Sequence, residues 1–201
     1  MKFTKISADT FKKLQLNAGV LLSSFDPDSA SIVDTAILGA TTGGVRFNAA
    51  PTFSDFGADI DNCPKNTKEL KRVDDWTVSM SGTFITVDAS VAARLVALAD
   101  EADGKITPRT TLKIDDFADI WWVGDYSDVD GGFIAIHLMN ALSTGGFSIQ
   151  TGDKAKGQFA FEFTGHFSMD AQDTVPFEIY VSEAASDAAA ANVEEEEEAD
   201  A

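Results

Sequence analysis

The residue types that most often carry out chemistry in proteins are scarce in this sequence. The chain has one cysteine, Cys63, and two histidines, His137 and His166, each inside a segment that we expect to be a strand. No second ligand stands at the spacing of a metal site, and no serine or cysteine lies in a nucleophile motif. We therefore expect both histidines to be cross-strand or interface side chains, and we expect no enzyme, catalytic residue, metal or cofactor.

Two glycine-containing stretches partly match the sequence motifs of ligand-binding loops but lack the residues that such loops need. The sequence GATTGG at Gly39–Gly44 has no Lys-Ser/Thr pair after it, so it does not match a phosphate-binding loop. The sequence DYSDVDGG at Asp125–Gly132 is similar to a calcium loop with Gly131 at its sixth position. Tyr126 and His137 then occupy the first and twelfth positions, where Asp and Glu are required, so we interpret this stretch as a turn.

Paired carboxylates and paired tryptophans leave two alternatives to a structural role. The pairs Asp74-Asp75 and Asp115-Asp116 are adjacent in sequence, and adjacent residues of a strand point to opposite faces, which disfavours a glycosidase site. An acidic or calcium-dependent hydrolase of β fold thus rests on the carboxylates alone. Trp121-Trp122 and the acidic surface are better suited to the other alternative, a β-sandwich module that binds carbohydrate or a cell-wall polymer.

Strand-like alternation dominates the segments that would have to position any site. In the run from Trp76, side chains of alternating polarity indicate a half-buried strand, and Gly82 within it indicates a bulge or a close approach of two chains. Further runs of this kind are separated by Gly, Asp, Asn and Pro, as strand turns require. The expected strands lie in the runs GVRFNAAPTFSDF, WTVSMSGTFITV, IWWVGDY, FIAIHLMNAL, QFAFEFTGHFSM and VPFEIYVSE.

One segment has helical periodicity instead. Val91, Leu95 and Leu98 fall on one stripe after Asp88, which is a suitable N-cap, and Gly104 is a suitable stop. We expect this helix to seal one side of a mainly β fold, either a β-sandwich or a partly closed barrel.

Two connections are longer than tight turns, and loops of that length are usually functional or disordered. They run over Asp26–Thr42 and Asp55–Asp75. The second has an acidic first part and a basic second part, a segregation that suits contact with another copy of the chain, although a solvated surface loop is an equal alternative. The candidate contact residues are Asp55, Asp59, Asp61, Lys65, Lys68, Lys71 and Arg72.

Composition and charge exclude several classes of protein. The 201 residues carry a formal net charge of −18, which disfavours binding to phosphate backbones or to anionic membranes. A hydrophobic content of 44% is enough for a real core. We expect a β domain over 1–183, with a short helix over Ser7–Leu16 and no secretory leader, and a disordered Ala/Glu-rich tail over 184–201 that holds seven of the acidic residues.

The order of four stretches resembles the major tail protein, or tail tube protein, of long-tailed bacteriophages. These are AGVLL at Ala18–Leu22, GATTGGVRFNAAPTFSDF at Gly39–Phe56, TVSMSGTFITVDASVAARLVALAD at Thr77–Asp100, and GGFSIQTGDKAKGQFAFEFTGHFSMD at Gly145–Asp170. The resemblance covers about residues 10–183, and it rests on this order and on the strand–helix–strand arrangement.

The resemblance implies a structural role in the virion. Proteins of that family fold as a β-sandwich or barrel with a flanking helix, and they form homohexameric rings that stack into the tail tube through which DNA is ejected. It also implies contacts with other tail proteins, such as the tape measure and tail terminator, and assembly in the host cytoplasm without a membrane. In that family the loop matching Asp55–Asp75 reaches the adjacent ring, and DNA passes through the lumen without specific binding.

Overall fold

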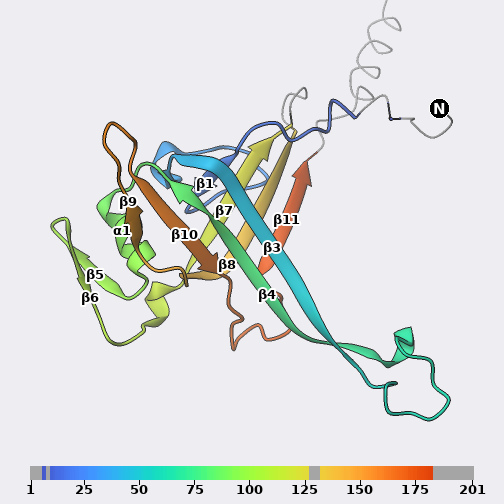
Figure 1. Ribbon diagram of the computed structural model, residues 1–201. Helices are drawn as coiled ribbons and strands as arrows, with labels where there is room; N and C mark the ends of the chain where they lie inside the picture. The colour runs from blue at the N-terminus through green and yellow to red at the C-terminus, as the bar shows by residue number, and fades with distance from the viewer. Residues whose placement is uncertain (1–5, 8–9, 127–131, 183–201) are drawn as a thin grey trace, which may run out of the picture.

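The fold is mainly β, with one large antiparallel sheet, one small sheet and one α-helix (Figure 1). The computed structural model describes residues 6–7, 10–126 and 132–182. No helix within these ranges is long and apolar enough to cross a membrane. The elements are β1 (Val20–Leu22), β2 (Ile37–Gly39), β3 (Thr41–Asp55), β4 (Lys71–Phe84), α1 (Ala89–Val96), β5 (Ala99–Ala102), β6 (Lys105–Pro108), β7 (Ala118–Asp125), β8 (Phe133–Ser143), β9 (Ser148–Gln150), β10 (Gln158–Thr164) and β11 (Phe177–Ser182), with 3-10 helices at Asp34–Ala36, Lys68–Leu70 and Ile114–Asp116.

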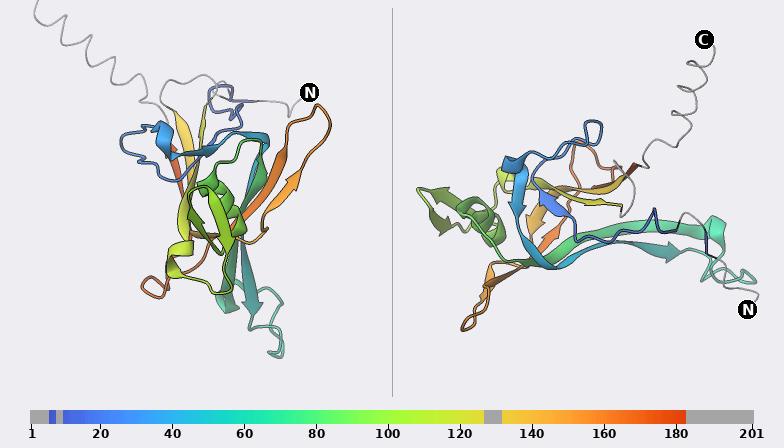
Figure 2. Two further views of the ribbon diagram at one scale, coloured as in Figure 1. Left: turned by 90° about the vertical axis from the view of Figure 1, so that its left-hand side faces the viewer. Right: turned by 90° about the horizontal axis from the view of Figure 1, so that it is seen from above.

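The large sheet bends across itself at strand β8. Its order is β2-β1-β7-β8-β10-β4-β3, and one edge of β8 is shared, because β11 pairs with Phe133–Leu138 and β10 pairs with Leu142 and Ser143. Strands β10, β4 and β3 consequently lie across the face of β7, β8 and β11 (Figures 1 and 2). The sheet does not close into a barrel, since β2 and β3 end its order without an outer partner among the described residues.

The main core fills the space between the two halves of this sheet. Its fully buried side chains come from strands of both halves and from α1, so burial of their apolar surface holds the layers together. Phe84 and Phe161 pack with ring centroids 4.5 Å apart at the centre. The buried members are Leu21, Leu38, Val78, Met80, Phe84, Val91, Leu95, Ile120, Leu138, Ala141, Phe161 and Phe163.

Helix α1 covers one end of this core, as its periodicity predicts, but it is shorter than expected. The Asp88 carboxylate accepts a hydrogen bond from the Val91 N–H at 2.8 Å, which confirms the N-cap, and Val91 and Leu95 are buried. The helix ends at Ala97, whose φ is +71°, so the predicted stop at Gly104 is wrong. Leu98 lies beyond the helix and is half-buried.

The prediction at Gly82 is confirmed as a close approach, while the bulge lies in the partner strand. A Cβ added at Gly82 would stand 2.7 Å from the Phe161 ring, so only glycine fits there. The register of β3 shifts opposite this point, between Thr42 and Val45, where Gly43 and Gly44 have positive φ. The glycines that resemble a phosphate loop therefore form a strand irregularity.

The structure corrects three further expectations about local structure. Within Ser7–Leu16 the described residues form a turn over 10–13 and a bridge at Gln15, and no helix. His166 lies two residues beyond β10 and outside any strand, whereas His137 is in β8 as expected. The stretch Asp26–Thr42 contains a 3-10 turn, all of β2 and the start of β3. The tail over 184–201 lies outside the described residues.

Candidate assembly interface

Strands β3 and β4 form a long two-stranded arm that projects from the body (Figures 1 and 2). Their pairing continues from the core to Asp55 and Lys71, so the expected loop over Asp55–Asp75 is in fact a tip of residues 56–70 plus strand. Residues 71–75 of β4 are all exposed, because no layer of the described residues covers either face of the arm there. An isolated two-stranded ribbon is marginally stable in water, so this outer half gains little from packing within one copy.

The Asp55 carboxylate organises the tip from within. It accepts hydrogen bonds from the Asn66 N–H at 2.9 Å and the Gly57 N–H at 3.0 Å, and these bonds hold its pKa below the usual value of 3.8. The Phe56 N–H donates to the Leu70 carbonyl, which closes the base of the tip. Asp55 therefore acts as a structural anchor, and its carboxylate is already committed within its own chain.

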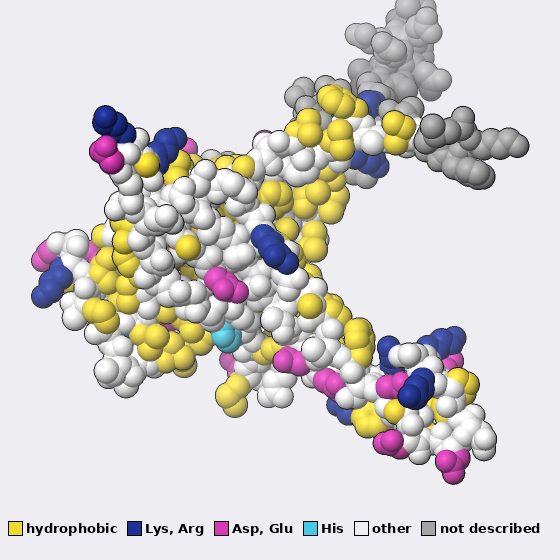
Figure 3. Space-filling model, in the orientation of Figure 1, with side chains coloured by type: hydrophobic (Ala, Val, Ile, Leu, Met, Phe, Trp, Pro, Cys, Tyr) yellow, Lys and Arg dark blue, Asp and Glu magenta, His cyan; other side chains and the backbone are white. Residues whose placement is uncertain are grey.

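The other six candidate charges are exposed and lie on the arm. Asp59 and Asp61 stand on the outgoing side of the tip. Lys65 and Lys68 stand on the returning side, where Lys68 lies 3.4 Å from Glu69, and Lys71 and Arg72 follow in β4. Figure 3 shows cationic and anionic side chains gathered at this end of the molecule. The structure thus brings the predicted residues together on one projection, with Asp55 alone in an internal role.

The arm also exposes large apolar side chains, which the charge pattern did not indicate. Phe53 and Val73 are paired directly across the strands, and both are exposed. The ammonium group of Lys71 lies 5.5 Å from the centroid of the Phe53 ring. Phe56, 60% exposed, and Ile60 extend the apolar surface onto the tip. Exposed apolar side chains gathered on one projection are typical of surfaces that contact another molecule.

The tryptophans expected to serve a carbohydrate-binding module do not form an exposed platform. Trp121 is 7% exposed and stacks on His137, with ring centroids 3.9 Å apart and 7° between planes. Trp122 points toward the main core and donates from Nε1 to the Ala18 carbonyl at 3.0 Å. His137 Nε2 lies 3.1 Å from Asp119, so this histidine is a cross-strand side chain as predicted.

The remaining candidates for chemistry do not converge on a site. Among the residues the structure describes, no group of three or more His, Cys, Asp or Glu side chains is arranged to hold a metal ion. In the calcium-like stretch residues 127–131 lie outside the described ranges, and the Tyr126 N–H donates to the Gly132 carbonyl. Asp116 is paired with Arg109, whereas Asp115 beside it is exposed.

Comparisons with known proteins add no family to this picture. No protein-family model matches the chain, and no curated protein is significantly similar to it.

Proposed function

We propose that this protein is a structural subunit of a bacteriophage tail tube, which forms homohexameric rings that stack around a DNA conduit. The observation that carries the proposal is the β3–β4 arm, a long ribbon whose outer half is covered by no other described segment and exposes both apolar and charged side chains. Such a surface is stabilised when it meets another subunit. In a stack of rings, the arm reaches the adjacent ring.

Open strand edges support the same role. Strand β3, with 15 residues, and strand β11 each have one edge without a partner in the part of the chain described. Unpaired edges of this length promote aggregation in a monomer, but an assembly that pairs or covers them removes the hazard. A ring built by heterologous contacts uses two different surfaces of each copy, and stacking uses two more.

The proposed location is the tail tube of the virion, reached after assembly in the host cytoplasm. Its partners are other copies of the chain and the tail proteins at the tube's ends and interior, with no membrane and no enzyme activity involved. DNA passes through the tube without being retained, since a subunit with a formal net charge of −18 repels phosphates on balance.

Negative-stain electron microscopy of the concentrated protein tests the proposal. We expect hollow rings or tubes from the wild-type chain. Reversal of Lys68, Lys71 and Arg72 to Glu reverses three of the four basic side chains at the outer end of the arm, and we expect that variant to fold while its tubes are lost or shortened. Lys12, Lys154 and Lys156, which are exposed outside the arm, give a control variant with the same change in net charge. A wild-type protein that stays monomeric at every concentration overturns the proposal.

A further inference from the structure

We propose that the arm of one copy docks on a specific surface of a second copy, made by hairpin β5–β6 and the loop of residues 109–116 that follows it. We call this surface the acceptor. This inference rests on the proposed function and deepens it by naming the surface that the arm contacts. Its chemistry is an apolar centre with an acidic rim, matched to the apolar side chains of the arm and to the basic side chains on the returning side of its tip.

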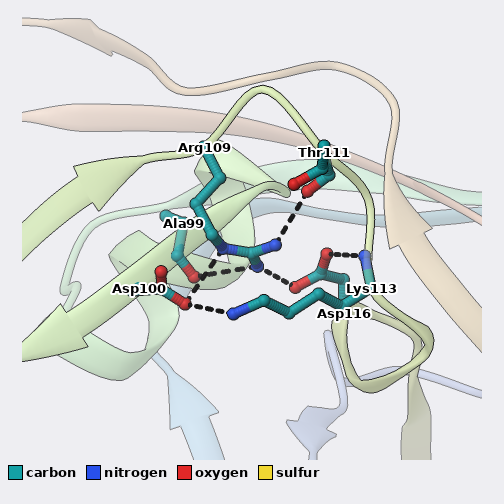
Figure 4. Close-up of polar contacts among 6 residues, drawn as sticks. All are labelled: Ala99, Asp100, Arg109, Thr111, Lys113 and Asp116. Carbon is teal, nitrogen blue, oxygen red and sulfur yellow. Dashed lines mark hydrogen bonds and ion pairs between the residues drawn. The ribbon is translucent and has the colours of Figure 1, made fainter.

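The acceptor loop is held rigidly by Arg109, whose side chain is largely buried (Figure 4). Arg109 pairs with Asp116 and, at 2.9 Å, with Asp100, and it donates to the Thr111 carbonyl at 2.8 Å. The Lys113 N–H donates to the second oxygen of Asp116 at 2.8 Å, and its ammonium group reaches Asp100 at 3.0 Å. These contacts fasten the loop to β5 from both ends.

This rigid loop presents apolar side chains to solvent. Leu112 and Ile114 stand within the fastened segment, and Ile114 is 88% exposed. Figure 3 shows hydrophobic side chains on the surface at the end of the molecule away from the arm. A loop fixed in one conformation loses little conformational entropy on binding, so its exposed Leu112 and Ile114 form a preorganised apolar centre.

The charges around the two surfaces are complementary. On the acceptor, Asp100 and Asp116 are neutralised by Arg109 and Lys113, which leaves three exposed acidic side chains against Lys105 alone. On the arm, residues 62–72 carry four basic side chains and one acidic one. Opposite charges at the rim favour contact between the acceptor and this returning side of the arm. The acidic side chains of the acceptor rim are Glu101, Asp103 and Asp115.

The positions of the two surfaces suit an open-ended stack. Figure 2 shows the arm extending to one side of the molecule, while α1 and hairpin β5–β6 lie at the opposite side. A head-to-tail contact between different surfaces repeats without closing when these surfaces lie at opposite ends of the subunit. The arm and the acceptor therefore meet the geometric requirement for contact between successive rings.

Thiol cross-linking tests the contact directly, because Cys63 in the arm tip is the chain's only cysteine. With a short bis-maleimide, the wild type can link to no more than dimers, since each copy has one thiol. Leu112→Cys adds a thiol at the opposite end, so we expect a ladder of trimers and longer chains on a denaturing gel. Ser148→Cys, on exposed β9, is the matched control and is expected to give no such ladder.

A charge swap tests the same contact without a cross-linker. Lys65→Glu with Lys68→Glu should raise the protein concentration needed for tubes about tenfold, because two attractive pairs become repulsive. Glu101→Lys with Asp115→Lys should do the same, and the four changes together should restore assembly.

The outcomes separate the acceptor from the proposed function. Tubes that form while Leu112→Cys gives no more ladder than Ser148→Cys overturn the acceptor and leave the tube role standing. The acceptor is also overturned if the fourfold variant assembles no better than either double variant. A wild-type chain that forms neither rings nor tubes overturns both.

Discussion

Leu95 and Leu112 carry the same side chain in opposite environments. Leu95 is 0% exposed and packs from α1 into the main core, whereas Leu112 is 51% exposed on the acceptor loop. We expect Leu95→Ala to lower the free energy of unfolding by about 2–5 kcal/mol, because it removes buried methyl groups and leaves a cavity. Leu112→Ala should change it by less than about 0.5 kcal/mol. Urea denaturation of both monomers measures the difference, and equal effects would contradict the burial of α1.

Asp116 makes the stability of the acceptor loop depend on pH. The hydrogen bond from Arg109 and then that from the Lys113 N–H hold the pKa of Asp116 below its usual value of 3.8. Because the folded state binds this proton more weakly than the unfolded state, the carboxylate stabilises the fold above pH 3.8. That stabilisation is lost as the pH falls through the folded-state pKa.

We therefore expect Asp116→Asn to be less stable than the wild type at pH 7, with a gap that narrows as the pH falls below about 3.8. Thermal unfolding across the acid range measures this gap. Asp170→Asn, at an exposed position of another loop, is the control and should track the wild type. A gap that stays constant down to the lowest pH would show that Asp116 contributes through shape and not through charge.

At the scale of elements, local sequence signals located most strands. They placed two boundaries wrongly, namely the end of the helix and the point where the arm strands give way to the tip. The helix was predicted to continue to Gly104, because the alanines and acidic residues after Ala97 are compatible with a helix. They form hairpin β5–β6, whose two turn residues, Asp103 and Gly104, both have positive φ. Asp-Gly between two strands is a hairpin signal in its own right, and it was available in the sequence.

The length of the β3–β4 pairing was underestimated for a different reason. Its two charged halves were interpreted as one loop, yet Asp55 and Lys71 face each other as the last pair of the β3–β4 ladder. Exposed strand residues have no alternation of buried and exposed side chains to reveal them, so their pairing depends on continuing a ladder that begins in the core. The cross-strand pairing of the exposed residues Phe53 and Val73 could not be predicted for the same reason.

This geometry allows the tip to be removed cleanly. Replacement of residues 56–70 by Asn-Gly joins Asp55 to Lys71 through a two-residue turn, the commonest hairpin connection. We expect the melting temperature to change by less than about 4 °C, because the tip makes its contacts within itself, and we expect tube formation to be lost. Calorimetry and electron microscopy measure the two effects. Tubes of normal length from this variant would show that the tip is not required for assembly.

At the scale of the whole molecule, the path of the large sheet could not be predicted from sequence. Strand β8 contacts β11 and β10 along one edge, and neither partner is the next strand in the chain, which is β9. Alternation assigns a strand to a half-buried surface, but it does not identify its neighbours. Strand-like alternation and one helical stripe predicted a mainly β fold with a single helix, which is confirmed, while the open course of the sheet and the acceptor surface come from the three-dimensional arrangement.

Net charge is the property of the whole molecule that bears most directly on a DNA conduit. A wall that neutralised phosphates would release counterions and retain DNA, whereas an acidic wall repels the phosphates and lets the duplex slide. With a formal charge of −18 per chain, we expect the lumen of the proposed tube to carry more Asp and Glu than Lys and Arg. Assembled tubes should then fail to retain short duplex DNA in cosedimentation even at low salt, where binding to a basic surface is strongest. A cryo-electron microscopy map with a net basic lumen, or DNA that sediments with the tubes and is released by salt, would contradict this explanation of the acidity.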